Sequence, residues 1–242
     1  MATQEQRRQK QLARKKAKRK SVHKDLARLK QGGMAGEFAR LANAPVLDCL
    51  VADSIEEQGI GMVLLSRELR NGQVAFANYL IDAYCLGVKN VHAEIRSKAS
   101  YRDDIRNALL QRGSFQAVSP GHLRKLVESA AEYARDLGFP PHKDYRIGKE
   151  LLGNIDASDC DAVFEFGRDG KPCFISGPYD TPERSQQIVS ILTERCGVNN
   201  FHFTIGISGS AFNLIGVDDG DIDADVIDAE DWQEVDNDEY LE

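Results

Sequence analysis

The sequence predicts an α+β fold, in which an antiparallel sheet built from hairpins packs against three to four helices and both charged ends are disordered. Two turn signals predict the hairpins, because Asn71-Gly72 and Asp169-Gly170 each lie between apolar, strand-like runs. Several later stretches place apolar residues at helical spacing and end at a glycine. Strands first and helices afterwards are typical of α+β proteins rather than doubly wound α/β proteins.

The first half of the folded part is predicted to be mostly strand. A short helix over residues 35–41 ends before Pro45, since proline disrupts a helix. Four predicted strands follow: residues 46–52, 61–69, 74–86 and 90–95. The run 74–86 is apolar on both faces, which is typical of a central strand covered on both sides. Gly87 is expected to bend the chain before the sheet continues.

The second half is predicted to be richer in helix. Ser100 with Asp103 resembles a capping box for a helix that ends near Gly113. Ser119-Pro120 is a cap followed by a first-turn proline, and that helix ends at Gly138. The remaining predicted elements are a helix over 145–152, a hairpin of strands 162–166 and 172–176, a helix from Thr181-Pro182 to Gly197, and a strand over 201–205.

Charge divides the chain into a basic arm, a folded domain and an acidic tail. Residues 1–33 hold twelve Lys and Arg against two acids, whereas residues 217–242 hold thirteen Asp and Glu and no Lys or Arg. We expect the arm to be disordered or a solvated helix and the tail to be disordered, because neither has enough apolar residues for a core. The range 34–216 is therefore the predicted single domain, and the net charge of -7 describes none of the three parts.

Composition excludes several classes of protein. No apolar run approaches the ~20 residues of a membrane-spanning helix, and the basic start has no apolar stretch of a signal peptide behind it. The five cysteines are an odd number without a C-x-x-C pair, which favours free thiols in a reducing cytoplasm. We therefore expect a cytoplasmic protein that does not bind a membrane.

No motif predicts a metal or a cofactor. The run from Asp221 to Asp225 only partly matches a calcium loop, because Val226 stands where that loop needs glycine and Trp232 where it needs glutamate. The histidines are scattered, and no dinucleotide-binding, P-loop or zinc-protease pattern occurs. We therefore predict no metal site and no cofactor.

Two segments carry a resemblance to a known group. Residues 82–89 (DAYCLGVK) and 166–172 (FGRDGKP), with the helix over 121–138, resemble an uncharacterised group of bacterial proteins of similar length. The resemblance covers roughly residues 46–205 and leaves out both charged ends. It implies a bacterial origin and a shared fold, and it implies no activity.

The basic arm contains the clearest binding signal. Six cations fall within seven residues: Arg14, Lys15, Lys16, Lys18, Arg19 and Lys20. Such a cluster neutralises phosphates and binds RNA, DNA or the ribosome in a salt-dependent way without reading sequence. The arm has no aromatic residue to stack on bases, so phosphate contact is the expected mode. The alternatives are a solvated tail, or an arm that binds the acidic tail.

The acidic tail predicts a different partner. Its carboxylates imitate the charge of a nucleic acid and would attract a basic protein surface. Trp232 and Tyr240 are the tail residues that would anchor it in a groove of a partner. An interaction or regulatory protein that acts through this tail is therefore one alternative function.

Asp82 is the strongest candidate for a catalytic residue. It lies in an otherwise apolar strand, where a buried carboxylate needs partners. With Tyr84, Lys89 and Glu94 it would form the centre of an enzyme of unassigned class, such as a hydrolase or nuclease. The structural alternative is an Asp82 carboxylate bound to backbone N–H groups or to Lys89.

The leading hypothesis is a non-enzymatic cytoplasmic binding protein. Its arm would contact nucleic acid or the ribosome, and its folded domain would contact a protein partner. The enzyme centred on Asp82 and the protein acting through its acidic tail are the alternatives.

Overall fold

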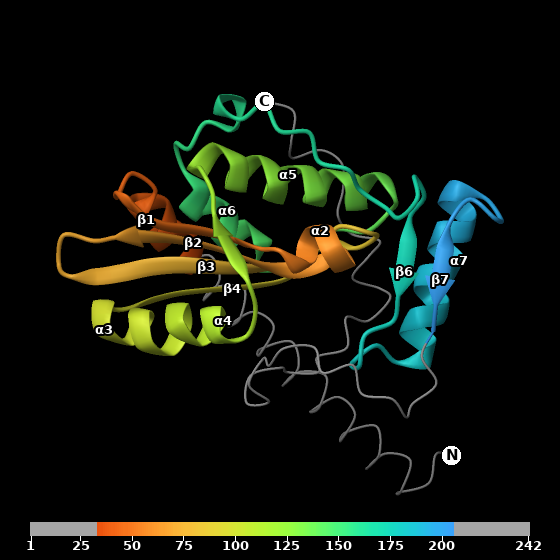
Figure 1. The fold of residues 1–242 in the computed structure, drawn as a ribbon, viewed down its shortest axis with the longest axis horizontal. Coiled ribbons are helices and arrows are strands. Elements are labelled where there is room, and N and C mark those ends of the chain that lie inside the picture. Colours follow the sequence, from red (N-terminus) through yellow and green to blue (C-terminus); the bar gives the residue numbers. More distant parts are fainter. Residues whose placement is uncertain (1–32, 206–242) are drawn as a thin grey trace, which may run out of the picture. The chain divides into compact units, whose positions relative to one another are not determined.

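The fold is of the α+β class and is built around one antiparallel sheet (Figure 1). The computed structural model describes residues 33–205, so most of the predicted arm and all of the predicted tail lie outside the described residues. The sheet has five strands in the order β4-β3-β2-β1-β5. They are β1 (Val46–Ala52), β2 (Ile60–Glu68), β3 (Gln73–Asp82), β4 (Gly87–Ser97) and β5 (Phe115–Ala117).

The predicted first hairpin is confirmed. β2 and β3 pair antiparallel from Ile60 opposite Asp82 to Glu68 opposite Val74. The turn between them contains Asn71-Gly72, and Gly72 has a φ of 77°, a backbone conformation that glycine adopts readily.

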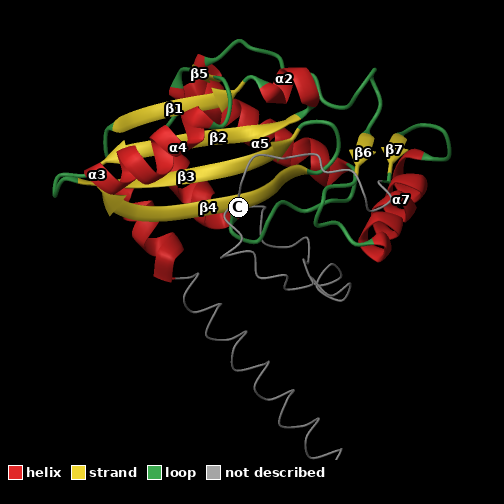
Figure 2. Ribbon diagram, turned by 60° about the horizontal axis from the view of Figure 1, so that its bottom comes forward, coloured by secondary structure: helices red, strands yellow, loops and turns green. Residues whose placement is uncertain are grey.

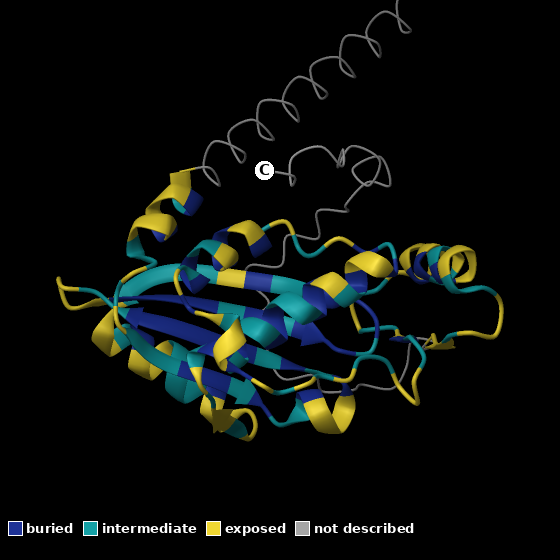
Figure 3. Ribbon diagram, turned by 90° about the horizontal axis from the view of Figure 1, so that it is seen from above, coloured by how far each residue is buried: buried dark blue, intermediate teal, exposed yellow. Residues whose placement is uncertain are grey.

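Helices cover both faces of this sheet (Figure 2). On one face, Ala77 and Tyr79 of β3 pack with residues of α5 (Pro120–Asp136), α6 (Tyr145–Leu152) and the helix over residues 33–41. On the other face, Phe76 packs with Tyr101 and Leu109 of a helical run over residues 98–111. The strands are accordingly the most buried part of the fold (Figure 3). β3 is thus an interior strand covered on both faces, as its apolar sequence predicts, although β2 and not β3 occupies the middle of the sheet.

The helix starts at Ser119 and Thr181 are confirmed by their caps. The Ser119 hydroxyl accepts the backbone N–H of His122 at 3.2 Å and begins α5. The Thr181 hydroxyl accepts the N–H of Arg184 at 3.2 Å and begins α7 (Pro182–Cys196). Each cap satisfies a backbone donor that has no partner within the first turn of the helix.

The helical run over 98–111 begins earlier than predicted. Its cap is Ser97, whose hydroxyl accepts the N–H of Ser100 at 3.2 Å, so Ser100 does not cap it. The run consists of α3 (Lys98–Ser100), a π-helical stretch η1 (Tyr101–Asn107) and α4 (Ala108–Gln111). The Tyr101 hydroxyl donates to the carboxylate of Asp48 at 2.7 Å, which fastens the π-helical stretch to β1.

The predicted second hairpin is wrong. Asp169 and Gly170 have positive φ values of 53° and 74°, as in a tight turn, but only an isolated bridge between Arg168 and Lys171 flanks it. Residues 162–166 form no strand, and the N–H of Gly167, directly after them, donates to the carbonyl of Ala83 at 2.9 Å and not to a hairpin partner. Instead β6 (Cys173–Ile175) pairs in parallel with β7 (His202–Thr204) as a separate sheet.

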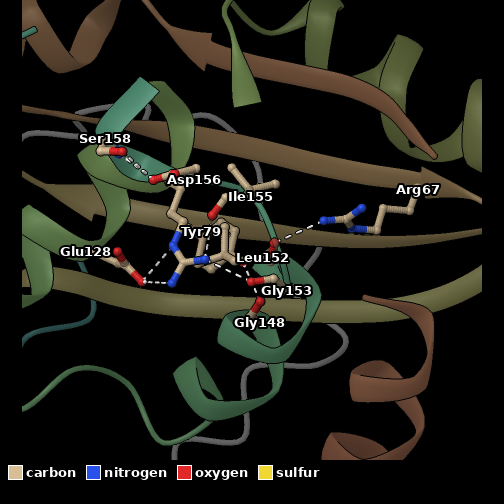
Figure 4. Close-up of polar contacts among 10 residues, drawn as sticks. Arg67, Tyr79, Glu128, Gly148, Leu152, Gly153, Ile155, Asp156 and Ser158 are labelled. Carbon is tan, nitrogen blue, oxygen red and sulfur yellow. Dashed lines mark hydrogen bonds and ion pairs between the residues drawn. The ribbon is translucent and has the colours of Figure 1, made fainter. Parts of the chain in front are cut away.

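Arg67 and Tyr79 fasten α6 to the main sheet (Figure 4). The buried Arg67 guanidinium donates to the carbonyls of Leu151 at 2.8 Å and Leu152 at 3.0 Å. These last-turn carbonyls have no partner within the helix, so the arginine satisfies them. The Tyr79 hydroxyl donates to the carbonyl of Gly148 at 2.7 Å. Sequence patterns did not predict either contact.

Two short elements were not predicted from the sequence: α2 (Ser54–Gln58) and β5. A short 3-10 turn, η2 (Ala157–Asp159), completes the described elements. None of the helices in residues 33–205 is long and apolar enough to cross a membrane.

Candidate interaction surface

The second sheet is only partly enclosed, since all three residues of β7 are exposed. It has only two strands, and they are parallel, whereas parallel strands are usually covered on both faces. β6, β7 and α7 lie beyond the end of the main sheet at which β3 turns into β4 (Figures 1 and 2). Phe174 of β6 is fully buried with residues of α7, of the last turn of α5 and of the segment directly after α5: Ala134, Leu137, Phe139, Ile188 and Leu192. One face of the pair is therefore anchored by a small apolar core.

The hydrogen bonds of β7 show which of its edges is open. The N–H of His202 donates to the carbonyl of Pro172 at 2.8 Å, and the carbonyl of Thr204 accepts the N–H of Ser176 at 2.9 Å. Backbone groups of successive strand residues point to opposite sides, so the N–H and C=O of Phe203 point away from β6. Within residues 33–205, no strand pairs with that outer edge.

Two apolar side chains of this strand run are exposed beside the open edge: Phe203 is 52% exposed and Ile205 is 40% exposed. Ile175 of β6 is 43% exposed but pairs with Thr204, so it lies on the opposite face of the sheet. The run 198–205 contains no Lys, Arg, Asp or Glu. Edge strands of monomers are usually protected by shortness, charges, prolines or bulges; β7 is short, but this run has no charge and no proline. We call the outer edge of β7 together with Phe203 and Ile205 the β7 surface.

A cluster of charges holds this sheet on the main one. The carboxylate of Asp180, in the loop before α7, accepts the N–H of Gly177 at 2.7 Å and the guanidinium N–H of Arg184 at 3.2 Å. The ammonium of Lys89, on β4, lies 3.8 Å from the same carboxylate. Both Lys89 and Asp180 are largely buried, at 17% and 9% side-chain exposure, so the pair is only weakly screened by water.

Asp82 is buried, as its place in an apolar strand predicts. It is 6% exposed, and its Oδ1 accepts the N–H of Tyr84 at 3.1 Å and of Cys85 at 3.0 Å. Burial raises the pKa of Asp82, while the charge of Lys89 and these backbone bonds oppose the rise. The carboxylate thus closes the turn between β3 and β4. This turn is also the reason why β3 ends at Asp82 and not at residue 86 as predicted.

Tyr84 and Lys89 lie near Asp82 but do not complete a catalytic arrangement. The carbonyl of Tyr84 accepts the N–H of Cys173 at 2.9 Å, which joins the turn to β6. Its ring lies against Gly59, where an added Cβ would come within 2.3 Å of a ring carbon. Tyr84 and Lys89 therefore connect the main sheet to the second sheet, one through its backbone and the other through its charge.

Glu94 is not part of this group, contrary to the predicted catalytic set. It lies opposite Phe76 in the pairing of β3 with β4, whereas Asp82 lies opposite Gly87. Six residues along a strand separate the two positions by about 20 Å. Glu94 instead pairs with Arg96 at 2.8 Å and with His92 at 3.4 Å on the sheet surface.

The cysteines and the acidic groups give no sign of metal chemistry in the described part. All five cysteines are unpaired, as predicted, and Cys85 is fully buried. Burial raises the pKa of the Cys85 thiol, which disfavours the reactive thiolate at neutral pH. Across residues 33–205, no group of three or more His, Cys, Asp or Glu side chains is arranged to hold a metal ion.

The remaining predicted binding residues lie outside the described residues. They are Arg14, Lys15, Lys16, Lys18, Arg19 and Lys20 of the arm, and Trp232 and Tyr240 of the tail. Comparisons of the chain with protein-family models, with curated proteins and with solved structures found no match.

Proposed function

We propose that this chain is a non-enzymatic binding protein that holds nucleic acid with its arm and a protein partner at the β7 surface. The observation that carries the proposal is the open, uncharged edge of β7 with half-exposed Phe203 beside it. An edge of this kind accepts a further strand through backbone hydrogen bonds, and apolar side chains beside it add affinity. We place the protein in the reducing cytoplasm, and its unpaired cysteines support this assignment.

The arm contributes the charge for nucleic acid. Its six clustered cations would each release counterions on contact with phosphate, so affinity should fall steeply with salt. The arm leads into the helix over residues 33–41, and Ala35 and Phe38 of this helix are buried in the main core. Nucleic acid bound by the arm would therefore be held close to the folded domain.

The enzyme hypothesis receives less support than the binding hypothesis. The Asp82 carboxylate is already bonded to two backbone N–H groups, and Glu94 belongs to another part of the sheet. A general acid or base needs a polar atom that can reach a substrate. The contacts of Asp82 and Tyr84 favour the structural role instead.

Co-purification from a reduced cell lysate tests the proposal. Three full-length proteins are compared at low and high salt: wild type, a variant with Arg14, Lys15, Lys16, Lys18, Arg19 and Lys20 replaced by glutamine, and Phe203→Lys. We expect the glutamine variant to lose nucleic acid and to keep the protein partner. We expect Phe203→Lys to lose the protein partner and to keep nucleic acid.

Two results would count against the proposal. Nucleic acid that co-purifies equally with wild type and the glutamine variant would show that the arm does not bind it. A protein partner that is retained by Phe203→Lys but lost when the chain stops at Val217 would indicate the acidic tail, with Trp232 and Tyr240, as the interaction site.

A further inference from the structure

We infer that the partner at the β7 surface is a second copy of this chain, joined by antiparallel pairing of β7 with β7 around Phe203. This inference rests on the proposed function, because it identifies the protein that occupies the surface proposed there. Three observations carry it: the direction of the backbone groups, the pattern of side chains and the absence of charge.

The backbone groups of Phe203 are arranged for a symmetric pair. In an antiparallel ladder, two directly opposed residues can exchange both of their N–H to C=O bonds. His202 and Thr204 use their backbone groups toward β6, which leaves the N–H and C=O of Phe203 on the same outer side. Phe203 of each copy can therefore exchange both bonds with Phe203 of the other across a two-fold axis.

The side chains match themselves in this register. When Phe203 opposes Phe203, Ile205 lies opposite Phe201 of the second copy, and Thr204 lies opposite His202. Side chains alternate between the faces of a strand, so apolar residues meet apolar residues on one face and polar residues meet polar residues on the other. The ring centroids of Phe201 and Phe203 are 6.0 Å apart in one chain, which already aligns them on one face.

The lack of charge favours a second copy over a charged partner. Residues 198–205 contain no Lys, Arg, Asp or Glu, so two copies meet there without repulsion between like charges. An acidic or basic peptide would find no opposite charge in this run. Continuation of the sheet across the two-fold axis would give a sheet of four strands. Such a sheet covers the open edge of β7 and is more stable than an isolated pair of strands.

The shortness of β7 limits the affinity. Its three residues form a small contact, so we expect a reversible dimer with a dissociation constant in the micromolar range or weaker. Such a dimer would carry two basic arms. Binding of both arms to one nucleic acid would raise the overall affinity without any new contact.

Analytical ultracentrifugation of the full-length chain tests the inference. The runs use high salt, which screens attraction between oppositely charged segments of different copies. We expect the average mass of wild type to rise from 26.9 kDa toward twice that value as the protein concentration increases. Phe203→Lys should stay at 26.9 kDa, because it puts a charge of the same sign on each side of the axis.

Tyr179→Lys is the matched control, since Tyr179 is an exposed aromatic residue that is 67% exposed and lies outside β7. It should dimerise like wild type. Thermal unfolding checks that Phe203→Lys is folded, and little change is expected because Phe203 is 52% exposed. A monomeric wild type throughout the concentration range, or equal self-association of wild type and Phe203→Lys, would overturn the inference.

Amide hydrogen exchange gives a second readout in the same samples. The amide of Phe203 should become more protected as the protein concentration rises, whereas the amide of Thr204, which faces β6, should be protected at every concentration. Protection of Phe203 that does not change with concentration would contradict a second copy. If the chain stays monomeric but Phe203→Lys still loses another protein from the lysate, the inference fails while the proposed function stands.

Discussion

The ammonium of Lys89 lies 3.8 Å from the carboxylate of Asp180, and this ion pair joins β4 of the main sheet to the loop before α7. Beside it, the N–H of Cys173 donates to the carbonyl of Tyr84, which joins β6 to the turn after β3. Tyr84 lies in the turn that Asp82 closes, and Lys89 lies shortly after this turn, so both links are made at the same end of the main sheet. The position of the β7 surface therefore depends on the region that the sequence marks as a candidate catalytic centre.

Replacement of Asp180 should loosen the second sheet. Asp180→Asn removes the charge that faces the largely buried Lys89 and weakens the bonds to Gly177 and Arg184. We expect the free energy of unfolding to fall by about 1–3 kcal/mol, the range for leaving a buried polar group without its partner. Urea unfolding measures this loss, and amide exchange should show faster opening over residues 173–205.

Asp169→Asn is the control for that experiment, because it removes the same charge from an exposed loop nearby. Asparagine also tolerates the positive φ of 53° at this position. Equal losses of stability in the two variants would show that the Lys89–Asp180 pair does not hold the second sheet.

Two substitutions of Asp82 should separate a structural carboxylate from a catalytic one. In Asp82→Asn the side-chain oxygen can still accept the N–H groups of Tyr84 and Cys85. The neutral amide also avoids the cost of burying a charged carboxylate, the same cost that raises the pKa of Asp82. We expect its stability at neutral pH to stay within about 1 kcal/mol of wild type. Asp82→Ala leaves both donors unsatisfied and should lose about 1–3 kcal/mol for each. Urea unfolding measures both variants, and a loss in Asp82→Ala as small as that in Asp82→Asn would contradict the structural role.

Gly148 should not tolerate a side chain. A Cβ there would lie 2.7 Å from Cε1 of Tyr79 and 3.0 Å from Cγ1 of Val91, so α6 would have to move off the sheet. Overpacking of this kind costs about 1–3 kcal/mol, more than the gain of up to about 1 kcal/mol in helix propensity. Thermal or urea unfolding of Gly148→Ala should therefore show a net loss of stability.

Gly36→Ala is the matched control for Gly148→Ala. Gly36 also lies in a helix, and nothing lies within 4 Å of the position of its added Cβ. We expect this variant to gain stability, by up to about 1 kcal/mol. If Gly148→Ala gained stability as Gly36→Ala does, the close packing of α6 against Tyr79 would be refuted.

Acid should destabilise the protein through His142. Burial lowers the pKa of His142, partly offset by Asp144, and the neutral ring nitrogen Nδ1 accepts the N–H of Asp144 at 3.2 Å. Because the folded-state pKa is below the unfolded value of about 6.5, the unfolded chain binds the proton more readily. The neutral His142 ring therefore contributes its full stabilisation at pH values above the unfolded-state pKa. This stabilisation is lost as the pH falls through the lower, folded-state pKa of His142.

Urea unfolding across the range from slightly alkaline to mildly acidic pH measures this effect. Wild type should lose more stability than His142→Gln as the pH falls, since glutamine does not titrate. Parallel curves for the two proteins would show that His142 does not contribute to the pH dependence.

Local signals in the sequence were sufficient for most of the main sheet and its helices. Asn71-Gly72, Ser119-Pro120 and Thr181-Pro182 specify their turn or cap through their own backbone preferences. The burial of β3 on both faces likewise follows from the continuous apolar run of the strand itself. These elements could be predicted because the interactions that define them lie within a few residues.

The second sheet could not be predicted in this way. The turn at Asp169-Gly170 forms, yet β6 pairs with β7 across α7, because Phe174 is buried against Ile188 and Leu192. That choice depends on contacts distant in sequence. The β7 surface was missed for the same reason, although the alternation of Phe201, Phe203 and Ile205 in an uncharged run was a usable signal.

The most direct test of the account is the salt dependence of binding to a single-stranded RNA of arbitrary sequence, measured by fluorescence anisotropy with the full-length chain. We expect the logarithm of the affinity to fall linearly with the logarithm of the salt concentration. If all six clustered cations contact phosphates, they add roughly 4 to 5 units to that slope. Replacing them with glutamine should remove most of this contribution. An affinity that does not change with salt, or a slope that is the same in the glutamine variant, would contradict the claim that the arm binds nucleic acid.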